Sequence, residues 1–266
     1  MRTLGLDAVG TYRSRQVDGL RRLDVTNIGE LEQVMDDVGP DVVFLPAAEP
    51  NVDWCETHPD EAHALNVAPA LATLVAARER QARFLFFSTD YVFDGARGPY
   101  AETDPVNPQS VYARHKYEVE RRVLDAGETV VRTASVFGQE LAPGKNFVLR
   151  VIARLTAGEI VTAPKDQFST PTWADELAAA AMKVVDRGGL WHAAGPDLLA
   201  RDQFARLVAS VFALDESLVK SVSTSELHQA APRPMRSGLK TERLQRDAGF
   251  TFLPLRTSLE RLRPSL

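Results

Sequence analysis

The fold is decided by residues 84–116, which begin with FLFFSTDYVFDG and end with YARHK, the run from Tyr112 to Lys116. The apolar start of this stretch has the length of a strand and leads into hydroxyls and an acid before an Asp-Gly pair. Such a run is typical of a buried parallel strand that feeds a loop. Residues 110–126 have a helical pattern, and within it Tyr112 and Lys116 are four positions apart. This spacing places the two side chains on one face of a helix.

A phenol beside an ammonium group is a workable proton donor. Tyrosine has an ordinary pKa of about 10, and a nearby positive charge favours the phenolate and lowers that pKa. Thr89, at the end of the predicted strand, is placed to hold a substrate carbonyl oxygen while Tyr112 protonates it. A bare Y-x-x-x-K pair more often belongs to a solvated helix surface, so the residues around it carry the interpretation.

Those neighbours form a pattern of spaced matches. Residues 88–95, 99–100, 102–104, 107–108 and 112–116 closely resemble dTDP-4-dehydrorhamnose reductases of the extended short-chain dehydrogenase/reductase superfamily. The resemblance implies an α/β fold with a Rossmann-like, doubly wound parallel sheet and a smaller C-terminal substrate lobe. It also implies hydride transfer from a nicotinamide dinucleotide to a nucleotide-linked 4-keto sugar.

Composition is that of a globular protein. The 266 residues are 44% hydrophobic and 25% charged, with a net charge of −5 that leaves no basic footprint for nucleic acid. The single cysteine, Cys55, excludes an internal disulfide and suits a reducing cytoplasm. No apolar run approaches the roughly 18 residues of a membrane helix. The five histidines make no metal-ligand spacing. We therefore expect a cytoplasmic protein with no membrane segment and no metal.

Two short strands are expected near the start of the chain, at residues 7–12 and 20–26. In the resembled family the end of the first of these strands faces the adenosine ribose of the dinucleotide, and here Arg13 and Ser14 follow it. A basic side chain at this place suits a 2′-phosphate, so the resemblance favours NADPH, with NADH as the alternative. Arg13 is equally well read as an ordinary loop cation.

The resemblance implies further cofactor contacts. The Asp24-Val25 pair, at the end of the second strand, would lie against the adenine. A strand at residues 41–48 ends in Ala47 and Ala48, whose small side chains let a cofactor pass close to the backbone. The same two alanines also suit a tight junction between a strand and a loop, and both interpretations can hold. Lys116 would bind the nicotinamide ribose.

One part of the family pattern is absent from this sequence. The phosphate-binding turn G-x-x-G-x-x-G, the first strand and most of the first helix have no counterpart, and Met1–Gly5 read as the last turn of a helix capped by glycine. The missing strand is the central one in the order 3-2-1-4-5-6, so its two neighbours would lose their shared partner. We expect an N-terminally truncated chain, and the alternative is a degenerate relative.

The substrate side is expected to include Asn51, Asp90 and Tyr91. Asn51 would start a loop that lines the substrate pocket, and Asp90 and Tyr91 follow the strand that ends in Thr89. A long helix is expected from Pro59 to about Arg80. Asn66, within that helix, more often makes a structural hydrogen bond than takes part in chemistry.

The chain is expected to divide into residues 1–145, an NAD(P)-binding Rossmann-like domain incomplete at its N-terminus, and residues 146–266. The second part would complete the sheet and form the substrate lobe. Ser135 stands where the resembled reductases usually carry a tryptophan, and a serine cannot stack on a sugar ring. The identity of the sugar is therefore left open.

Two classes of function follow. The leading hypothesis is an NAD(P)H-dependent reductase of a nucleotide-linked 4-keto sugar, in which Tyr112 donates the proton, Thr89 positions the carbonyl and Lys116 lowers the pKa of Tyr112. The alternative is a non-catalytic binding or regulatory subunit like the β subunit of methionine adenosyltransferase, or an inactive truncated reductase. The partner is expected to be a nucleotide sugar, and a homodimer is one option for the assembly.

Overall fold

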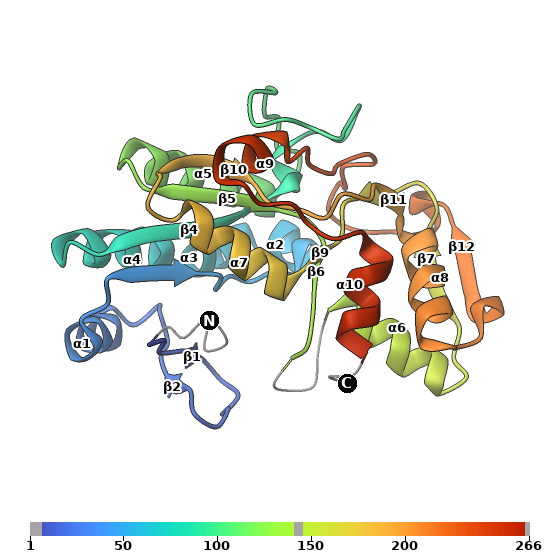
Figure 1. Ribbon diagram of the computed structural model, residues 1–266, viewed down its shortest axis with the longest axis horizontal. Helices are drawn as coiled ribbons and strands as arrows, with labels where there is room; N and C mark the ends of the chain where they lie inside the picture. The colour runs from blue at the N-terminus through green and yellow to red at the C-terminus, as the bar shows by residue number, and fades with distance from the viewer. Residues whose placement is uncertain (1–6, 141–145, 264–266) are drawn as a thin grey trace.

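Figure 1 shows the computed structural model of the chain, which describes residues 7–140 and 146–263. In chain order the elements up to Phe137, with η for a 3-10 helix, are β1 (Thr11–Tyr12), β2 (Arg21–Arg22), α1 (Ile28–Val38), β3 (Val42–Leu45), α2 (Val52–Thr57), α3 (Pro59–Asn66), α4 (Ala68–Glu79), β4 (Arg83–Thr89), η2 (Asp90–Val92), α5 (Val111–Asp125), β5 (Thr129–Thr133) and β6 (Val136–Phe137). The elements that follow are α6 (Phe147–Thr156), β7 (Val161–Pro164), β8 (Phe168–Ser169), β9 (Thr172–Trp173), α7 (Ala174–Val184), β10 (Gly189–His192), β11 (Leu199–Ala200), α8 (Arg201–Phe212), η3 (Glu216–Leu218), β12 (Val219–Val222), η4 (Thr224–Leu227), α9 (Glu242–Ala248) and α10 (Leu255–Leu262). The helical turn expected at Met1–Gly5 lies outside the described residues.

The largest sheet is parallel throughout, with the strand order β10-β5-β4-β3. Its central strand β4 shows why both faces are covered. Phe84 and Phe86 pack into a core with α4 and α5, whereas Leu85 packs into a second core with α7 and α9. Side chains alternate between the two faces of a strand, so an unbroken apolar run needs helices on both sides. The predicted Rossmann-like, doubly wound α/β fold is confirmed.

The first two strands form a sheet of their own. β1 and β2 pair in parallel through two residues each, which is shorter than the strands expected at residues 7–12 and 20–26. Arg21 N donates to Gly10 O and Leu23 N donates to Tyr12 O, each at 2.9 Å. Within the described part of the chain this pair is not joined to β3, in agreement with the expected loss of a shared neighbour. A two-stranded ladder with no third strand is held by few bonds, which accounts for its short length.

Two local expectations are wrong. The single helix expected from Pro59 to Arg80 is two helices, because α3 ends at Asn66 and α4 begins at Ala68. Pro69 has no backbone N–H to donate and its ring crowds the preceding turn, so the helix is interrupted just before it. The loop expected at Asn51 is the start of helix α2, and the Asn51 side chain caps it by accepting a hydrogen bond from Trp54 N at 3.1 Å.

Two other local expectations are confirmed. Helix α5 spans Val111–Asp125 inside the predicted segment, and the Ser110 hydroxyl caps it by accepting from Ala113 N at 3.3 Å. Asn66 makes the structural hydrogen bonds expected of it. Its side chain accepts from Glu49 N at 2.6 Å and donates to Glu49 O at 3.3 Å.

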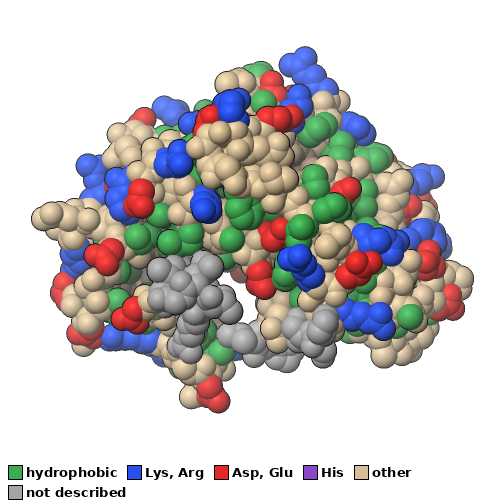
Figure 2. Space-filling view, in the orientation of Figure 1, with side chains coloured by type: hydrophobic (Ala, Val, Ile, Leu, Met, Phe, Trp, Pro, Cys, Tyr) green, Lys and Arg blue, Asp and Glu red, His purple; other side chains and the backbone are tan. Residues whose placement is uncertain are grey.

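A separate core lies beside the sheet, on the right in Figure 1. It is built by α6, α8, α10, β7 and β12 around Phe204, Val208 and Leu259. Figure 2 shows acidic and basic side chains interspersed over the face turned to the viewer. Of the helices in the described ranges 7–140 and 146–263, none is both long and apolar enough to cross a membrane.

Candidate active site

Two hydroxyl groups meet where β4 ends and α5 begins. Thr89 is the last residue of β4, and Tyr112 lies in the first turn of α5. The Thr89 hydroxyl lies close enough to the Tyr112 phenol to affect its pKa, and it accepts a hydrogen bond from Tyr91 N at 3.2 Å. Ser110 fixes the start of α5 and therefore the height of Tyr112 above the end of the strand. The predicted pair thus comes together through a parallel strand and the helix that follows it.

Lys116 lies one turn further along the same helix and is 5% exposed. Its Nζ donates to Phe87 O at 3.0 Å and lies 4.6 Å from the centre of the Phe86 ring. Burial lowers the pKa of Lys116 to about 8. Removing an ammonium group from water disfavours its charged form, and a carbonyl oxygen compensates for this only in part. Lys116 is therefore a buried cation held against the carboxyl end of β4.

The pKa of Tyr112 moves in the direction opposite to the expected one. Burial raises it, and the negative charges that Tyr91 and Asp90 carry when ionised add to the effect, while the adjacent Thr89 hydroxyl opposes it. Lys116 was expected to lower this pKa, but its ammonium group is directed at the carbonyl of Phe87. Desolvation of the phenol decides the sign. The phenol is consequently protonated over the whole physiological range.

Asp90 and Tyr91 lie next to this pair in different roles. Asp90 is 2% exposed, and its carboxylate accepts from Ser237 Oγ at 2.5 Å and from Thr89 Oγ1 at 3.3 Å. Burial raises the pKa of Asp90. The carboxylate is thus occupied by protein donors and ties the end of β4 to the C-terminal part of the chain. The half-buried Tyr91 ring meets the Tyr112 ring edge to face, with centroids 6.4 Å apart.

The third residue expected on the substrate side is not part of this cluster. Asn51 is exposed, and its side-chain oxygen is used by the cap of α2. Its neighbour in the same helix, Asp53, accepts from Arg233 Nη2 at 2.8 Å and from Ala231 N at 2.9 Å. The contact between this segment and the C-terminal lobe therefore runs through Asp53, which the sequence pattern did not single out.

The residues expected at the cofactor form two groups at strand ends. Arg13 Nε lies 3.3 Å from Asp24 Oδ2, which places these two side chains together beyond β1 and β2. Hydrogen bonds from Thr26 hold the pKa of Asp24 below its ordinary value, with a smaller effect from Arg13. Ser14 is exposed beside them and Val25 packs at the margin of the core.

The second group follows β3. Ala47 is exposed and Ala48 is half-buried. β3 is parallel to β4, so its end lies at the same edge of the sheet as Thr89. In an open parallel sheet, ligands bind beyond the carboxyl ends of the strands. The placement of the predicted residues agrees with that rule.

Two arginines that the sequence pattern did not mark converge near Tyr91. Arg201, the first residue of α8, donates to Ser135 Oγ at 3.1 Å, and its guanidinium carbon lies 4.2 Å from the centre of the Phe147 ring. Burial lowers the pKa of Arg201, and within the described residues its guanidinium meets no carboxylate. Arg233 is paired with Asp53. Its positive charge, like that of Arg201, opposes the rise that burial causes in the pKa of Tyr91. The site thus contains a half-buried positive charge that, within the described residues, has no carboxylate partner beside the tyrosine pair.

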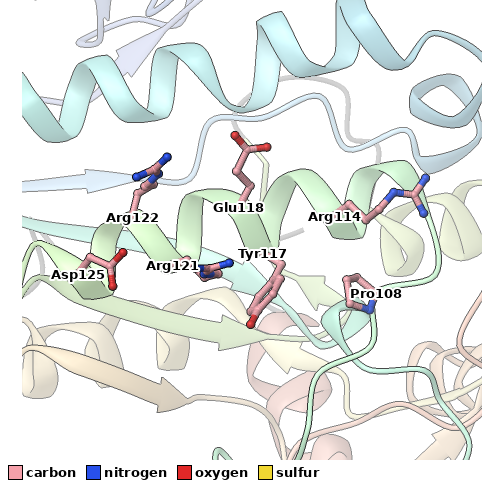
Figure 3. Close-up of a pocket in the computed structure, with 7 residues that line it drawn as sticks. All are labelled: Pro108, Arg114, Tyr117, Glu118, Arg121, Arg122 and Asp125. Carbon is pink, nitrogen blue, oxygen red and sulfur yellow. The ribbon is translucent and has the colours of Figure 1, made fainter.

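A surface hollow of about 300 Å³ lies elsewhere on α5. Its lining residues, shown in Figure 3, are Pro108, Arg114, Tyr117, Glu118, Arg121, Arg122 and Asp125. These α5 positions lie on the face of the helix turned away from Tyr112 and Lys116. The hollow is therefore separate from the candidate site. Within the described residues no three His, Cys, Asp or Glu side chains converge as metal ligands would.

Comparison with known proteins gives this geometry a context. Residues 3–265 match the family described as the RmlD substrate binding domain. A dTDP-4-dehydrorhamnose reductase of Mycobacterium tuberculosis is 38% identical over 212 residues, which cover 76% of this chain and 69% of the relative. A probable low-salt glycan biosynthesis reductase of Haloferax volcanii is 29% identical over 272 residues, which cover 98% of this chain and 91% of the relative.

A solved structure has the same architecture. The dTDP-4-dehydrorhamnose reductase of Bacillus anthracis, in complex with NADP, is 30% identical and superposes with a TM-score of 0.84, covering 92% of this chain and 87% of that chain. The fold agrees with these matches. The chain belongs to the dTDP-4-dehydrorhamnose reductase family of the extended short-chain dehydrogenase/reductase superfamily.

Proposed function

We propose that this chain reduces the keto group of a nucleotide-linked 4-keto sugar, with NADPH as the hydride donor. The family is one of NAD(P)-dependent oxidoreductases of the short-chain dehydrogenase/reductase type. The observation that carries the proposal is that the Thr89 hydroxyl and the Tyr112 phenol lie close together, one helical turn from the buried Lys116. Three polar groups with these roles, held on rigid elements, suit the protonation of a carbonyl oxygen.

The bound dinucleotide would supply the hydride, and the protein supplies the proton and the geometry. Tyr112 would donate its phenolic proton to the oxygen that becomes the product hydroxyl. The raised pKa keeps the phenol protonated before the reaction. Thr89 would hold the carbonyl oxygen within reach of Tyr112. Lys116 would bind the ribose next to the nicotinamide and stabilise the phenolate that remains.

The residues at the strand ends fit a dinucleotide with a 2′-phosphate. The guanidinium of Arg13 is 56% exposed, so it is accessible to an anion, and Asp24 fixes its direction. Ser14, Asp24 and Val25 would line the adenosine end. Ala47 and Ala48 carry no more than a methyl group, which leaves the backbone after β3 open to approach. These contacts favour NADPH over NADH because only NADPH carries the phosphate that Arg13 would bind.

The half-buried Arg201 supports an anionic substrate. A guanidinium that is partly removed from water is costly unless an anion balances it, and Arg201 meets a hydroxyl and a ring within the described residues. A phosphate group of a nucleotide sugar would balance it with bidentate hydrogen bonds. Tyr91 packs against Tyr112 and lies near Arg201, and it would contact the sugar. Asp90 would contribute indirectly, by accepting a hydrogen bond from Thr89 and so fixing the Thr89 hydroxyl. Asn51 would contribute only through the cap of α2.

The first experiment is calorimetric titration of the purified chain with NADPH and with NADH, followed by turnover of a panel of 4-keto sugar nucleotides. We expect tighter binding of NADPH and a steady loss of its absorbance with at least one member of the panel. A folded chain that binds neither dinucleotide would overturn the proposal. Dinucleotide binding without turnover of any sugar nucleotide would favour the non-catalytic binding subunit.

A further inference from the structure

A buried ion pair lies between α5 and β5. Glu120 and Arg132 have side chains that are 1% and 3% exposed, and the guanidinium meets the carboxylate through two nitrogens. Burying two charges costs free energy that their attraction often only just offsets, and an apolar pair of the same volume is often as stable or more stable. Stability alone is therefore a weak reason for such a pair. The geometry around it suggests another reason.

Glu120 completes a row of three contacts between α5 and β4. The Tyr112 phenol lies beside the Thr89 hydroxyl, Lys116 donates to Phe87 O, and Glu120 accepts from Ser88 Oγ at 2.8 Å. The three helix residues are spaced by four, so they form one stripe along α5. Their partners on β4 are three consecutive residues. The helix is thus held to the end of the strand along a single line, with the tyrosine at one end and the glutamate at the other.

Arg132 in turn is fixed from the side of the strands. It is the direct neighbour of Ser88 in the parallel ladder between β4 and β5. Its Nη1 lies 3.4 Å from His192 Nε2, and its guanidinium carbon lies 5.0 Å from the centre of the Phe93 ring. His192 Nδ1 donates to Tyr100 O at 3.2 Å, so Nε2 is the acceptor for Arg132. Burial lowers the pKa of His192 to about 3, which keeps the ring neutral and this arrangement intact.

We infer that Glu120 and Arg132 are positioning residues for the reduction. They hold α5 at the depth and rotation at which the Tyr112 hydroxyl meets Thr89 and Lys116 reaches Phe87. Neither residue touches the reacting atoms, because Glu120 lies two helical turns from Tyr112. The catalytic part of this inference rests on the proposed function, whereas its geometric part does not.

The test separates positioning from stability. Glu120→Gln and Arg132→Met each leave a buried charge or polar group without its partner, and both are expected to lower the melting temperature. The double variant Glu120→Leu with Arg132→Met replaces the pair by an apolar contact and is expected to regain the melting temperature of the wild type. It lacks the bond to Ser88, so its kcat is expected to stay about 10- to 100-fold below the wild type while KM changes little.

Two further variants complete the series. Ser88→Ala keeps the ion pair and removes only its link to β4, so it is expected to lower kcat without a large change in melting temperature. If the double variant does not fold, the kcat of Ser88→Ala tests the inference by itself. Glu176→Gln is the matched control. It alters a carboxylate on α7 that bonds Leu253 N at 2.9 Å and Ser258 Oγ at 3.1 Å, and it is expected to lower stability with kcat unchanged.

A second readout does not depend on turnover. The chain has five tyrosines, so their 13Cζ NMR signals can be resolved and Tyr112 assigned from Tyr112→Phe. A shifted or broadened Tyr112 signal in the double variant and in Ser88→Ala supports the inference, even if the wild type reduces no sugar nucleotide and the proposed function fails. A double variant that regains both the melting temperature and the wild-type Tyr112 signal, or the wild-type kcat, would overturn it.

Discussion

The hydroxyl of Thr89, the last residue of β4, lies beside the phenol of Tyr112 in the first turn of α5. The contact joins a strand end to the start of the helix that packs on the same strand. It places the proposed proton donor and the proposed carbonyl-binding hydroxyl at the edge of the sheet where ligands of parallel α/β folds bind. The predictions below examine the groups around this contact.

Tyr112→Phe removes the proposed proton donor and little else. We expect kcat to fall by about 10²- to 10⁴-fold, because that is the usual contribution of a positioned acid, while NADPH affinity is unchanged. Stopped-flow and steady-state assays would measure kcat, and calorimetry would measure the affinity. Tyr117→Phe, on the outward side of the same helix, is the control and is expected to keep full activity. Equal activity in both variants would remove Tyr112 from the mechanism.

Lys116 predicts a specific pH dependence. Its pKa of about 8 in the folded chain lies below the ordinary 10.5, so the unfolded chain holds the extra proton between these two pH values. The free energy of unfolding must then rise with pH across that window, and the cost of the buried ammonium is fully present below it. Each pKa unit is worth about 1.4 kcal/mol, so the total change is on the order of 3 kcal/mol.

Urea unfolding of the wild type and of Lys116→Met at several pH values would show this rise. The variant is expected to lack the rise, and Lys183→Met, an exposed lysine on α7, is expected to keep it. In the same window kcat/KM of the wild type is expected to fall with pH as Lys116 loses its charge. Parallel stability curves for the wild type and Lys116→Met would contradict a buried, titrating ammonium.

Arg201→Met tests the anion site beside Tyr91. Hydrogen bonds to a charged group contribute about 1.5–3 kcal/mol, so we expect KM for the sugar nucleotide to rise about 10- to 150-fold. NADPH affinity is expected to be unchanged and stability equal or higher, since a buried charge is removed. Arg154→Met, in an exposed pair with Glu159, is the control. An unchanged KM in Arg201→Met would exclude Arg201 as a phosphate ligand.

Arg13→Gln tests the preference for NADPH. Loss of the charge that would bind the 2′-phosphate is expected to weaken NADPH binding by about 10-fold or more, whereas NADH binding stays within about twofold. Calorimetry with both dinucleotides measures the ratio directly. Arg15→Gln, two positions further on, is the comparison variant. A parallel loss for both dinucleotides in Arg13→Gln would indicate a structural role through Asp24.

Local patterns in the sequence were enough where neighbouring residues decide the structure. β4 follows from an apolar run, and α5 follows from a serine cap and helical spacing, so both were predicted within about one residue of their observed bounds. The division of the helix at Val67 can also be predicted from the local sequence, since Pro69 follows two residues later, but the apolar pattern on both sides of Val67 favours a single helix. The cap at Asn51 is a local feature too, because the Asn51 side chain binds the backbone N–H of Trp54, three residues on.

Long-range contacts were not available in this way. Arg201 and Arg233 belong to the lobe that packs beside the sheet, and no spacing in the sequence shows that both reach Tyr91. The same holds for Asp53, whose partner Arg233 lies far along the chain. The direction of the Tyr112 pKa also depended on burial, which is a property of the packed molecule and not of the Y-x-x-x-K spacing.

The sequence by itself determined the fold class, the family and the identity of Thr89, Tyr112 and Lys116 as candidates, because period, caps and motif spacing act over short distances. Only the tertiary structure decided that Asp90 faces inward, that Lys116 is directed at Phe87, and that the pair of Glu120 and Arg132 joins α5 to β5. These features depend on which side chains exclude water together, and that is settled when strands and helices from distant parts of the chain pack.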